Sequence, residues 1–375
     1  MCTQNLKRLQ YNLKRFNHYT GRDSDRMPKA SSLSDLARHL GLSPATVSRA
    51  LAQHDAIALK TRERVAQAAL ELGYVPNRAA QALASGRSGF VGFALPMRGR
   101  GLADPFLGEF VSALTEGFAA QNVELLLSAV PREGSELRHL ENLVTSGRVD
   151  GIVLSRVETD DPRVTLLQER GVPFVTHGRL GQQETGYSWL DTDGRSSFAD
   201  AFEMLRGLGH RRIGLLSIDD PLTFRTLRED GVRSALQASG DPTLSLRQIS
   251  CSRYDQAGRE RAIDAMLAGP DRPTAVLAVA DGLALELMAR AQEQGLSVPE
   301  DLSIIGFDNI PSAGHVRPGL TTFDARIAES ATELAAMLLA RIAAPDQPHV
   351  TRLLSPQLVL RHSHGPAPQA RATEN

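Results

Sequence analysis

Apolar residues near the start of the chain recur three and four positions apart, which is the spacing of a helix that buries one face. The first stripe consists of Leu33, Leu36, Ala37 and Leu40. Gly41 follows it and favours the end of a helix. Ser43 suits the cap and Pro44 the first position of a second helix that runs to about Ala52. Two short helices are therefore expected, joined by a very tight turn.

A third helix is expected soon afterwards, with Thr61 as its cap. Its buried stripe would consist of Val65, Ala68, Ala69 and Leu72. Two helices joined by a tight turn and followed by a third are typical of a helix-turn-helix domain, whose second helix enters the major groove of DNA by its N-terminal end. A generic three-helix bundle with no DNA contact has the same spacing.

The second helix carries side chains that suit DNA. Pro44, Ala45 and Thr46 lie at its leading end, where small side chains permit close approach to bases. Ser48 can bond phosphate, and Arg49 can pair in bidentate fashion with a guanine edge. These residues are candidate DNA contacts, and the alternative is that they are simply solvated.

From Phe90 onward, short apolar runs alternate with helical patterns. The expected strands are FVGFALP, VELLLSAV, VDGIVLS, VPFVTHG, RIGLLSI, LSLRQIS, AVLAVA and LSIIGFD. The expected helices are 106–121, 137–146, 163–170, 198–208, 225–239, 256–268 and 282–294. This alternation predicts parallel sheets with helices on both faces, in two doubly wound α/β lobes. Ligands of such sheets bind beyond the C-terminal strand ends, here between the lobes.

Between these regions lies GYVPNRAAQALASGRS, residues 73–88, which has a proline start and room for one short helix. A helix this short is marginal alone, and Ala80, Leu83 and Ala84 would form a narrow apolar edge with nothing local to cover it. Such a segment can fold when it gains a partner, and Leu83 could wedge into a minor-groove base step. A simple linker is the alternative.

Charge separates the same two regions. The chain has a formal net charge of −1, but residues 1–88 carry 14 basic and 6 acidic side chains, whereas residues 89–375 carry 28 and 37. A basic head on an acidic body indicates a polyanionic partner for the head. A solvated face with a ragged basic tail would give the same balance.

Composition limits the other classes. The 375 residues favour two or three domains, and 42% hydrophobic content is ordinary for globular proteins. No apolar run is long enough to span a membrane, and the N-terminus lacks a signal-peptide core, so a cytoplasmic location is expected. Two cysteines are too few for a disulfide framework or a cysteine metal site.

The motifs of common enzyme classes are missing from the sequence. It has no GxGxxG after a strand, no phosphate-binding loop, no GxSxG and no metal-spaced cluster of histidine and cysteine. His139, His177, His210 and His315 are scattered and are interpreted as structural. Neither an enzymatic activity nor a cofactor or metal is expected.

The head closely resembles the DNA-binding headpiece and hinge of the LacI/GalR family of bacterial transcription regulators. The resemblance rests on LSDLARHLGLSPATVSRAL and on KTRERVAQAALELGYVPNRAAQALASGRS. It implies that Pro44, Ala45 and Arg49 read bases and that Asn77 and Leu83 are hinge contacts, with Leu83 intercalating. With the cap and stripe residues, the candidate DNA-binding set is Leu33, Ser43, Pro44, Ala45, Thr46, Ser48, Arg49, Thr61, Asn77 and Leu83. Ala52 departs from the family's usual asparagine.

The body resembles the effector domain of the same family, which is related to periplasmic sugar-binding proteins. The matching stretches include DPFLGEFVSALTEGF, LENLVTSGRVDGIVL, FRTLREDGVRSAL and GLSVPEDLSIIGFDNI. The resemblance implies that Arg228 and Asp308 bind the effector, one donating and the other accepting hydrogen bonds at vicinal hydroxyls. The further candidates are Phe106, Trp189, Asp193, Phe224 and Tyr254, for which core packing or helix capping is the alternative. Small residues at Ala280 and Gly282 would leave room for a disaccharide or larger glycoside.

These features together predict a sequence-specific transcriptional regulator, most simply a repressor, controlled by a small sugar. The family implies a homodimer on a pseudo-palindromic DNA operator, with the helix carrying Phe110, Leu114 and Phe118 at the seam between subunits. Alternatives are the same regulator with a purine or nucleoside effector, or a carbohydrate-binding protein or enzyme with an incidental basic head. The expected division is a disordered extension at 1–29, a helix-turn-helix domain at 30–75, a hinge at 76–88, an effector domain at 89–362 and a disordered tail at 363–375. Met27 is a second candidate for the first residue of the protein.

Overall fold

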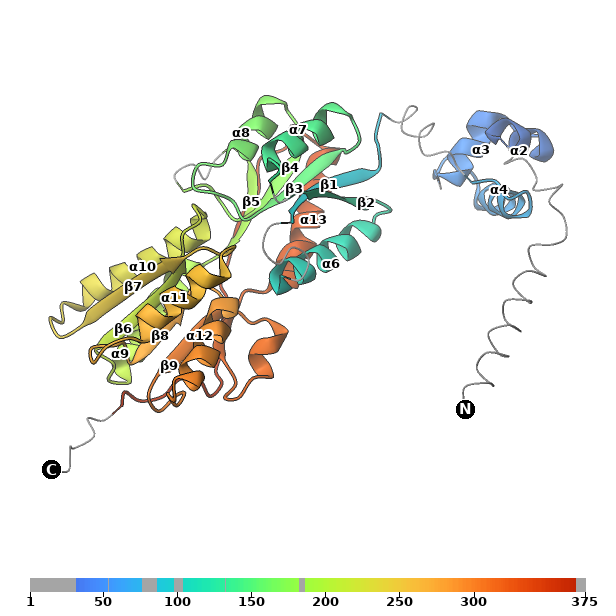
Figure 1. The fold of residues 1–375 in the computed structure, drawn as a ribbon. Coiled ribbons are helices and arrows are strands. Elements are labelled where there is room, and N and C mark those ends of the chain that lie inside the picture. The colour runs from blue at the N-terminus through green and yellow to red at the C-terminus, as the bar shows by residue number, and fades with distance from the viewer. Residues whose placement is uncertain are drawn as a thin grey trace, which may run out of the picture. The chain divides into compact units, whose positions relative to one another are not determined.

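The computed structural model of the chain describes residues 32–52, 54–75, 86–97, 104–131, 133–181 and 186–368. The chain divides into two units, Met1–Gly86 and Arg87–Asn375 (Figure 1). We call the described part of the first unit the headpiece and the second unit the body. The expected extension 1–29, most of the expected hinge, and the hinge residues Asn77 and Leu83 lie outside the described residues.

The headpiece has three helices. They are α2 (Leu33–Leu40), α3 (Pro44–Leu51) and α4 (Leu59–Glu71). Ser32 caps α2 and exchanges hydrogen bonds with Asp35 in a capping box, while Gly41 ends the helix in the left-handed conformation at φ 65°. The three helices share a small core of Leu36, Ala37, Leu40, Val47, Ala50, Val65, Ala68 and Ala69. This arrangement confirms the helix-turn-helix pattern read from the apolar spacing.

The expected cap of the third helix is wrong. Helix α4 begins at Leu59 with Ala58 at the cap position, where no side chain provides a capping hydrogen bond. Thr61 lies inside the first turn, and its backbone N–H donates to the carbonyl of Ala58 at 2.8 Å. The chain reaches helical geometry two residues before the polar side chain that suggested the start.

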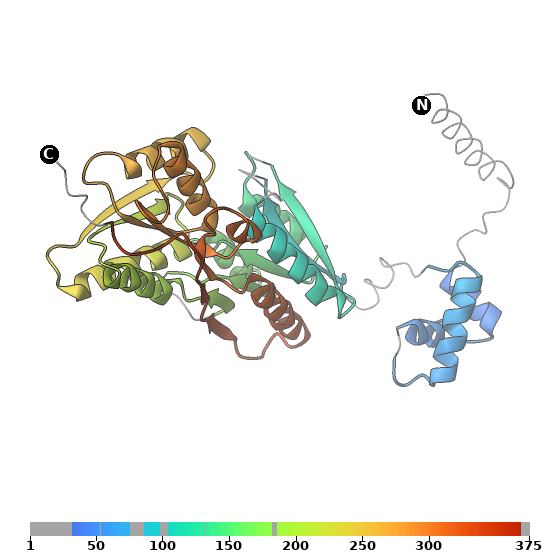
Figure 2. The same cartoon turned by 90° about the horizontal axis from the view of Figure 1, so that it is seen from below.

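The body consists of two α/β lobes, as the strand–helix alternation predicted (Figures 1 and 2). The first lobe holds a fully parallel sheet in the order β11-β5-β4-β3-β1-β2. Its strands are β1 (Phe90–Pro96), β2 (Glu124–Val130), β3 (Gly151–Ser155), β4 (Phe174–His177), β5 (Ser188–Thr192) and β11 (Thr351–Leu354). Its helices are α6 (Pro105–Ala119), α7 (Glu136–Thr145), α8 (Pro162–Glu169) and α13 (Ile327–Ala343).

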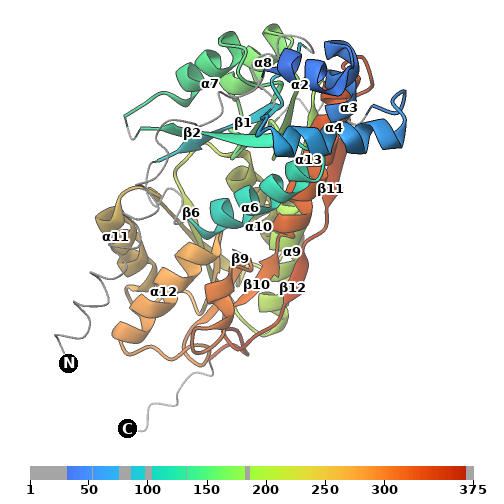
Figure 3. The same cartoon turned by 90° about the vertical axis from the view of Figure 1, so that its right-hand side faces the viewer.

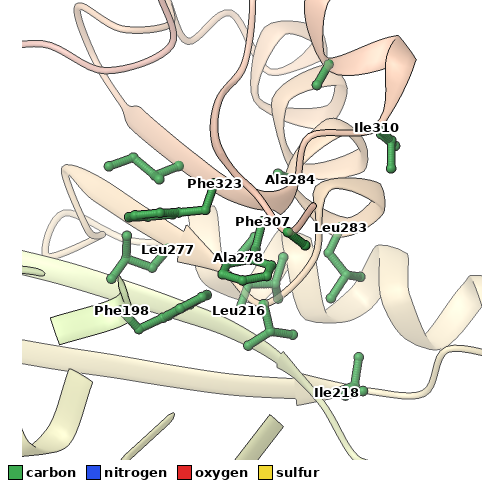
Figure 4. Packing of buried hydrophobic residues seen from close by; sticks show 14 of the residues in the cluster. Phe198, Leu216, Ile218, Leu277, Ala278, Leu283, Ala284, Phe307, Ile310 and Phe323 are labelled. Carbon is green, nitrogen blue, oxygen red and sulfur yellow. The ribbon is translucent and has the colours of Figure 1, made fainter. Parts of the chain in front are cut away.

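The second lobe repeats this plan in the order β12-β10-β9-β8-β6-β7, with only β12 antiparallel to its neighbour. Its strands are β6 (Arg212–Ile218), β7 (Ser245–Cys251), β8 (Ala275–Ala278), β9 (Ser303–Asp308), β10 (Thr321–Asp324) and β12 (Gln357–Val359). Its helices are α9 (Gly194–Gly207), α10 (Thr223–Ser239), α11 (Gln256–Leu267) and α12 (Asp281–Glu293), with a short 3₁₀ helix at Pro311–Gly314. Phe307 of β9 packs between the rings of Phe198 and Phe323 at the centre of this lobe (Figure 4).

Within the described residues, the chain passes between the lobes at three places: from β5 to α9, from β10 to α13 and from β11 to β12. The strands and helices that flank these crossings lie along one side of both lobes (Figure 3). Thr192 donates from Oγ1 to the carbonyl of Ala325 at 3.3 Å, and the N–H of Asp193 donates to the carbonyl of Leu354 at 2.8 Å. The three crossing segments are therefore hydrogen-bonded to one another, as in a hinge.

The C-terminal segment corrects a second expectation. Residues 363–368 belong to the second lobe and are not a disordered tail, because Ser363 is fully buried and donates to the carbonyl of Ile304 at 2.6 Å. The N–H of Thr321 in turn donates to the Ser363 hydroxyl at 2.8 Å. His210, also fully buried, bonds the carbonyl of Gly365 through Nε2 at 3.0 Å. This segment is polar in composition, yet its polar groups are the hydrogen-bonding partners of a buried strand edge.

Candidate functional sites: the DNA-binding helix and the interlobe cavity

The first candidate site is the exposed face of α3. The turn before it has only three residues, Gly41 to Ser43, and the Ser43 hydroxyl caps the helix by accepting from the N–H of Thr46 at 3.1 Å. Val47 and Ala50 are completely buried against the other helices. The opposite face of the helix is left to solvent.

Four of the ten predicted DNA contacts are exposed side chains of this helix. Pro44, Ala45, Ser48 and Arg49 are exposed, and Thr46 is half-buried. Leu33 instead packs half-buried against the headpiece core. The leading end of α3 therefore presents small side chains followed by a hydroxyl and a guanidinium, the arrangement that suits a helix entering the major groove.

The second candidate site is a cavity of about 430 Å³ in the body, lined by residues from both lobes. Of the predicted effector residues, Phe106, Phe224, Arg228, Tyr254 and Asp308 line it. Its volume falls within the range of pockets that enclose small organic ligands. Five of the seven predicted residues are thus brought together from separate elements.

The other two predicted residues have structural positions. Trp189 is buried in the core of the first lobe, with the guanidinium of Arg179 over its ring at 5.4 Å. Asp193 caps α9 by accepting from the N–H of Ser196 at 3.0 Å. Neither is among the residues that line the cavity in the described part of the chain.

Arg228 is the central cation of the cavity. Its guanidinium lies 3.7 Å from the ring centroid of Phe307 and 4.6 Å from that of Phe224, and it donates through Nη1 to the carbonyl of Val279. Gly194 permits this position, because a Cβ there would lie 2.9 Å from Cγ of Arg228. The arginine is only 7% exposed, and its Nε has no hydrogen-bond partner among the described residues. One donor is therefore fixed by the protein and another is left available.

Asp308 provides the carboxylate opposite this arginine. It ends β9 with a backbone φ of 119°, a conformation that L residues seldom adopt. Burial raises the pKa of Asp308 to about 8, and the nearby Arg228 opposes this rise. No hydrogen bond joins its carboxylate to another of the described residues. A strained, half-buried carboxylate without a hydrogen-bond partner is unfavourable without a ligand, so its position points to binding.

Asp281, which the sequence analysis did not single out, holds the loop that carries Asp308. Its carboxylate accepts from Oγ1 of Thr322 at 2.6 Å and from the N–H of Ile310 at 3.0 Å. Gly306 makes room, since a Cβ there would lie 2.2 Å from Oδ1 of Asp281. Burial raises the pKa of Asp281 to about 6. This residue positions the strand end and does not line the cavity.

The charges that line the cavity are balanced. In their ionised forms, Asp104, Asp191, Glu286 and Asp308 are matched by Arg156, Arg228, Arg253 and Arg259. Most are paired locally: Arg156 bonds Asp104, Arg259 bonds Glu286 at 2.9 Å, and Arg253 bonds Asp220 at 2.7 Å. A lining whose charged side chains are mostly paired already, and which is rich in donors, acceptors and aromatic rings, suits a neutral polyhydroxylated ligand better than an anion.

The lobes also meet directly at the edge of the cavity. The N–H of Thr159 donates to the carbonyl of Pro221, and the N–H of Thr223 to the carbonyl of Val157, both at 3.0 Å. These bonds pair a loop of the first lobe with the start of α10 in the second. A ligand between the lobes would therefore lie behind a rim closed by backbone hydrogen bonds.

The helix predicted at the subunit seam, α6, turns its three apolar marker residues inward. Phe110, Leu114 and Phe118 are each completely buried within the first lobe. Their helix packs closely on α13, since a Cβ on Gly117 would lie 2.8 Å from that of Ala335. The apolar stripe of α6 builds the lobe's own core, so these three side chains cannot form a contact between subunits.

Among the described residues, no helix is both long and apolar enough to cross a membrane. Nor does any group of three or more histidine, cysteine, aspartate or glutamate side chains there have the proximity to hold a metal ion.

A DNA-binding headpiece joined to a two-lobed body with a ligand-sized cavity defines a ligand-responsive transcriptional regulator. Comparison with known families agrees. Residues 32–77 match the model for bacterial regulatory proteins of the lacI family, and residues 202–364 match a periplasmic binding protein-like domain.

Individual proteins extend the match to nearly the whole chain. The transcriptional regulator AglR of Rhizobium meliloti (strain 1021) is 32% identical over 347 residues, covering 92% of this chain and 97% of AglR. The structure of a CelR–cellobiose complex is 29% identical with a TM-score of 0.66, covering 89% of this chain and 99% of CelR. The operator-bound lac repressor dimer is 26% identical with a TM-score of 0.76 and the same coverage of both chains. The chain belongs to the LacI family and is a DNA-binding transcriptional regulator.

Proposed function

We propose that this protein is a repressor whose binding to operator DNA is controlled by a small neutral carbohydrate held between the lobes. The observation that carries the proposal is the pair formed by Arg228 and Asp308. Arg228 is buried and Asp308 is half-buried in the cavity wall, and neither Nε of Arg228 nor the carboxylate of Asp308 has a hydrogen-bond partner among the described residues. One donates and the other accepts, as vicinal hydroxyls require.

The remainder of the cavity supports a sugar over an anion. Most of its charged side chains are already paired within the protein, and Phe106, Phe224 and Tyr254 offer aromatic faces that can cover the apolar faces of a pyranose. The similar CelR structure is a complex with cellobiose. A cavity of about 430 Å³ leaves room for a disaccharide.

The DNA side of the proposal follows the headpiece. Pro44, Ala45 and Arg49 would read bases and Ser48 would bond phosphate, while Asn77 and Leu83 remain predicted hinge contacts. A single α3 reads one half-site, so a homodimer on a pseudo-palindromic operator is the arrangement that doubles the contact. The similar lac repressor structure is a dimer bound to operator. The site of action is then the cytoplasm, where bacterial operators are found.

Calorimetry of the full-length protein with neutral disaccharides, monosaccharides and nucleosides tests the effector class. We expect binding of a sugar by the wild type and an affinity loss of about 10- to 100-fold in Arg228→Ala, because a charge-assisted hydrogen bond is lost from a buried site. Arg195→Ala is the matched control, since Arg195 is an exposed arginine of α9. Preference for a nucleoside, or unchanged sugar affinity in Arg228→Ala, would contradict the proposal.

A further inference from the structure

His177 lies at the end of β4, and its side chain lines the cavity from the first lobe. Its imidazole packs on the rings of Phe106 and Phe110, with centroids 5.5 and 5.1 Å away. The Nε2 atom is buried and has no hydrogen-bond partner among the described residues. A buried polar atom left without a partner is unfavourable and calls for an explanation.

A second buried histidine provides the contrast. His210 is fully buried, and both of its ring nitrogens are bonded: Nδ1 to Oγ1 of Thr274 at 2.8 Å and Nε2 to the carbonyl of Gly365 at 3.0 Å. This is how the fold treats a histidine whose role is structural. His177 is half-buried as a whole, but its Nε2 is buried without such a partner, and the side chain faces a cavity.

The other unpaired atoms at this cavity come from the opposite lobe. Oγ1 of Thr223 and Nε of Arg228 are also buried without partners among the described residues, and both side chains line the cavity. Burial lowers the pKa of the His177 imidazole to about 4, and the nearby positive charge of Arg228 adds to this shift. His177 is therefore neutral at physiological pH, able either to donate or to accept one hydrogen bond at Nε2.

We propose that His177 is a specificity-determining residue of the effector site, whose Nε2 hydrogen-bonds one particular hydroxyl of the sugar. This inference rests on the proposed function. It adds a residue of the first lobe that binds a sugar hydroxyl, facing the Arg228–Asp308 pair of the second lobe. A sugar that is hydrogen-bonded to both lobes links them. The hydroxyl that bonds His177 therefore helps to decide which sugars hold the two lobes together.

The test uses the full-length protein and the neutral disaccharide that the wild type binds most tightly in the panel above, together with its monodeoxy derivatives. Wild-type protein should bind one derivative about 10- to 100-fold more weakly than the parent through loss of the His177 bond. In His177→Phe the parent should bind as weakly as that derivative, and discrimination should vanish at that hydroxyl alone. His177→Gln, which keeps a hydrogen-bonding group, should restore part of it.

Two further measurements separate the possible failures. His139→Phe alters a histidine on the outer helix α7 and should bind every sugar as the wild type does. The thermal unfolding midpoint of the body should be close to that of the wild type in every variant, which reports intact folding. A His177→Phe variant that keeps the wild-type discrimination, or that weakens all the derivatives equally, would overturn the inference. Unchanged sugar affinity in Arg228→Ala would instead overturn the proposed function.

Discussion

The headpiece and the cavity achieve recognition in opposite ways. In the headpiece, the exposed face of one short helix presents Pro44, Ala45, Ser48 and Arg49 to solvent, and all four lie within six consecutive residues. In the cavity, the recognition groups line an internal space and come from separate strands and helices of two lobes. Polar groups on the headpiece are hydrated until DNA arrives, whereas Nε of Arg228 and Nε2 of His177 are already shielded from water without a hydrogen-bond partner among the described residues.

The two sites therefore differ in how much free energy they cost the protein before any ligand is bound. The DNA surface needs only a stable scaffold beneath it, and its contacts cost little while unused. The cavity carries the penalty of desolvated groups in the free protein, which a ligand with matching hydroxyls would relieve. Changes to the headpiece core should therefore act through folding, and changes to the cavity through binding.

The largest expected effect tests the scaffold side of the comparison. Leu36 is completely buried in the headpiece core, and Leu36→Ala should cost about 2–5 kcal/mol of local stability. A domain this small rarely holds more than about 3–5 kcal/mol. Operator binding in a gel-shift assay should consequently be lost, while sugar binding by the body measured by calorimetry stays unchanged.

Leu70→Ala is the matched control, because Leu70 lies on α4 of the same headpiece but is 79% exposed. It should leave operator binding close to that of the wild type. Sugar affinity that falls together with operator binding in Leu36→Ala would mean that the two units do not fold independently, and the comparison would be broken.

A smaller effect sharpens the cavity side. Because burial raises the pKa of Asp308 to about 8, this carboxyl is mostly protonated at pH 7 in the free protein. Hydroxyls that donate to the ionised carboxylate stabilise that form and lower its pKa, so sugar binding should release a proton. Affinity should rise by up to about tenfold from pH 7 to 9 and level off above pH 8.

Calorimetry in buffers of different ionisation enthalpy measures the released proton directly. Asp308→Asn should bind sugar more weakly than the wild type at pH 9 and show no proton release between pH 7 and 9. Equal proton release by both proteins would assign the titration to another group and remove the argument that Asp308 accepts from the ligand.

The apolar patterns predicted the fold well where a strand is an uninterrupted apolar run. The bounds of β1 and β6 agree with the sequence prediction, because FVGFALP and RIGLLSI are nearly all buried. Strand β10, TTFD, was not predicted, since its buried threonines are polar: the Thr322 hydroxyl donates to Asp281, and the Thr321 hydroxyl is bonded to Nδ1 of His364. Such burial depends on partners that are distant in sequence. Helix α13 does have an apolar stripe, but the sequence analysis assigned it no element.

The candidate sites also differ in how much of each could be predicted from the sequence. The candidate DNA contacts of the headpiece follow from one local motif, and the candidates Arg228 and Asp308 follow from family resemblance. His177 carried no distinguishing signal beyond its place after a buried strand, because its importance lies in what Nε2 lacks. Trp189 and Asp193 were reasonable candidates by residue type, yet the fold uses one in a core and the other as a helix cap.

The central claim is that the cavity's ligand controls the DNA-binding face, and operator affinity measured with and without saturating sugar tests it most directly. The account predicts a change of about 5- to 150-fold in the wild type, the usual range of allosteric coupling, with sugar affinity altered by the same factor when operator is present. In Asp308→Asn the same sugar concentration should change operator affinity little. Equal operator affinity with and without saturating sugar in the wild type would contradict the account.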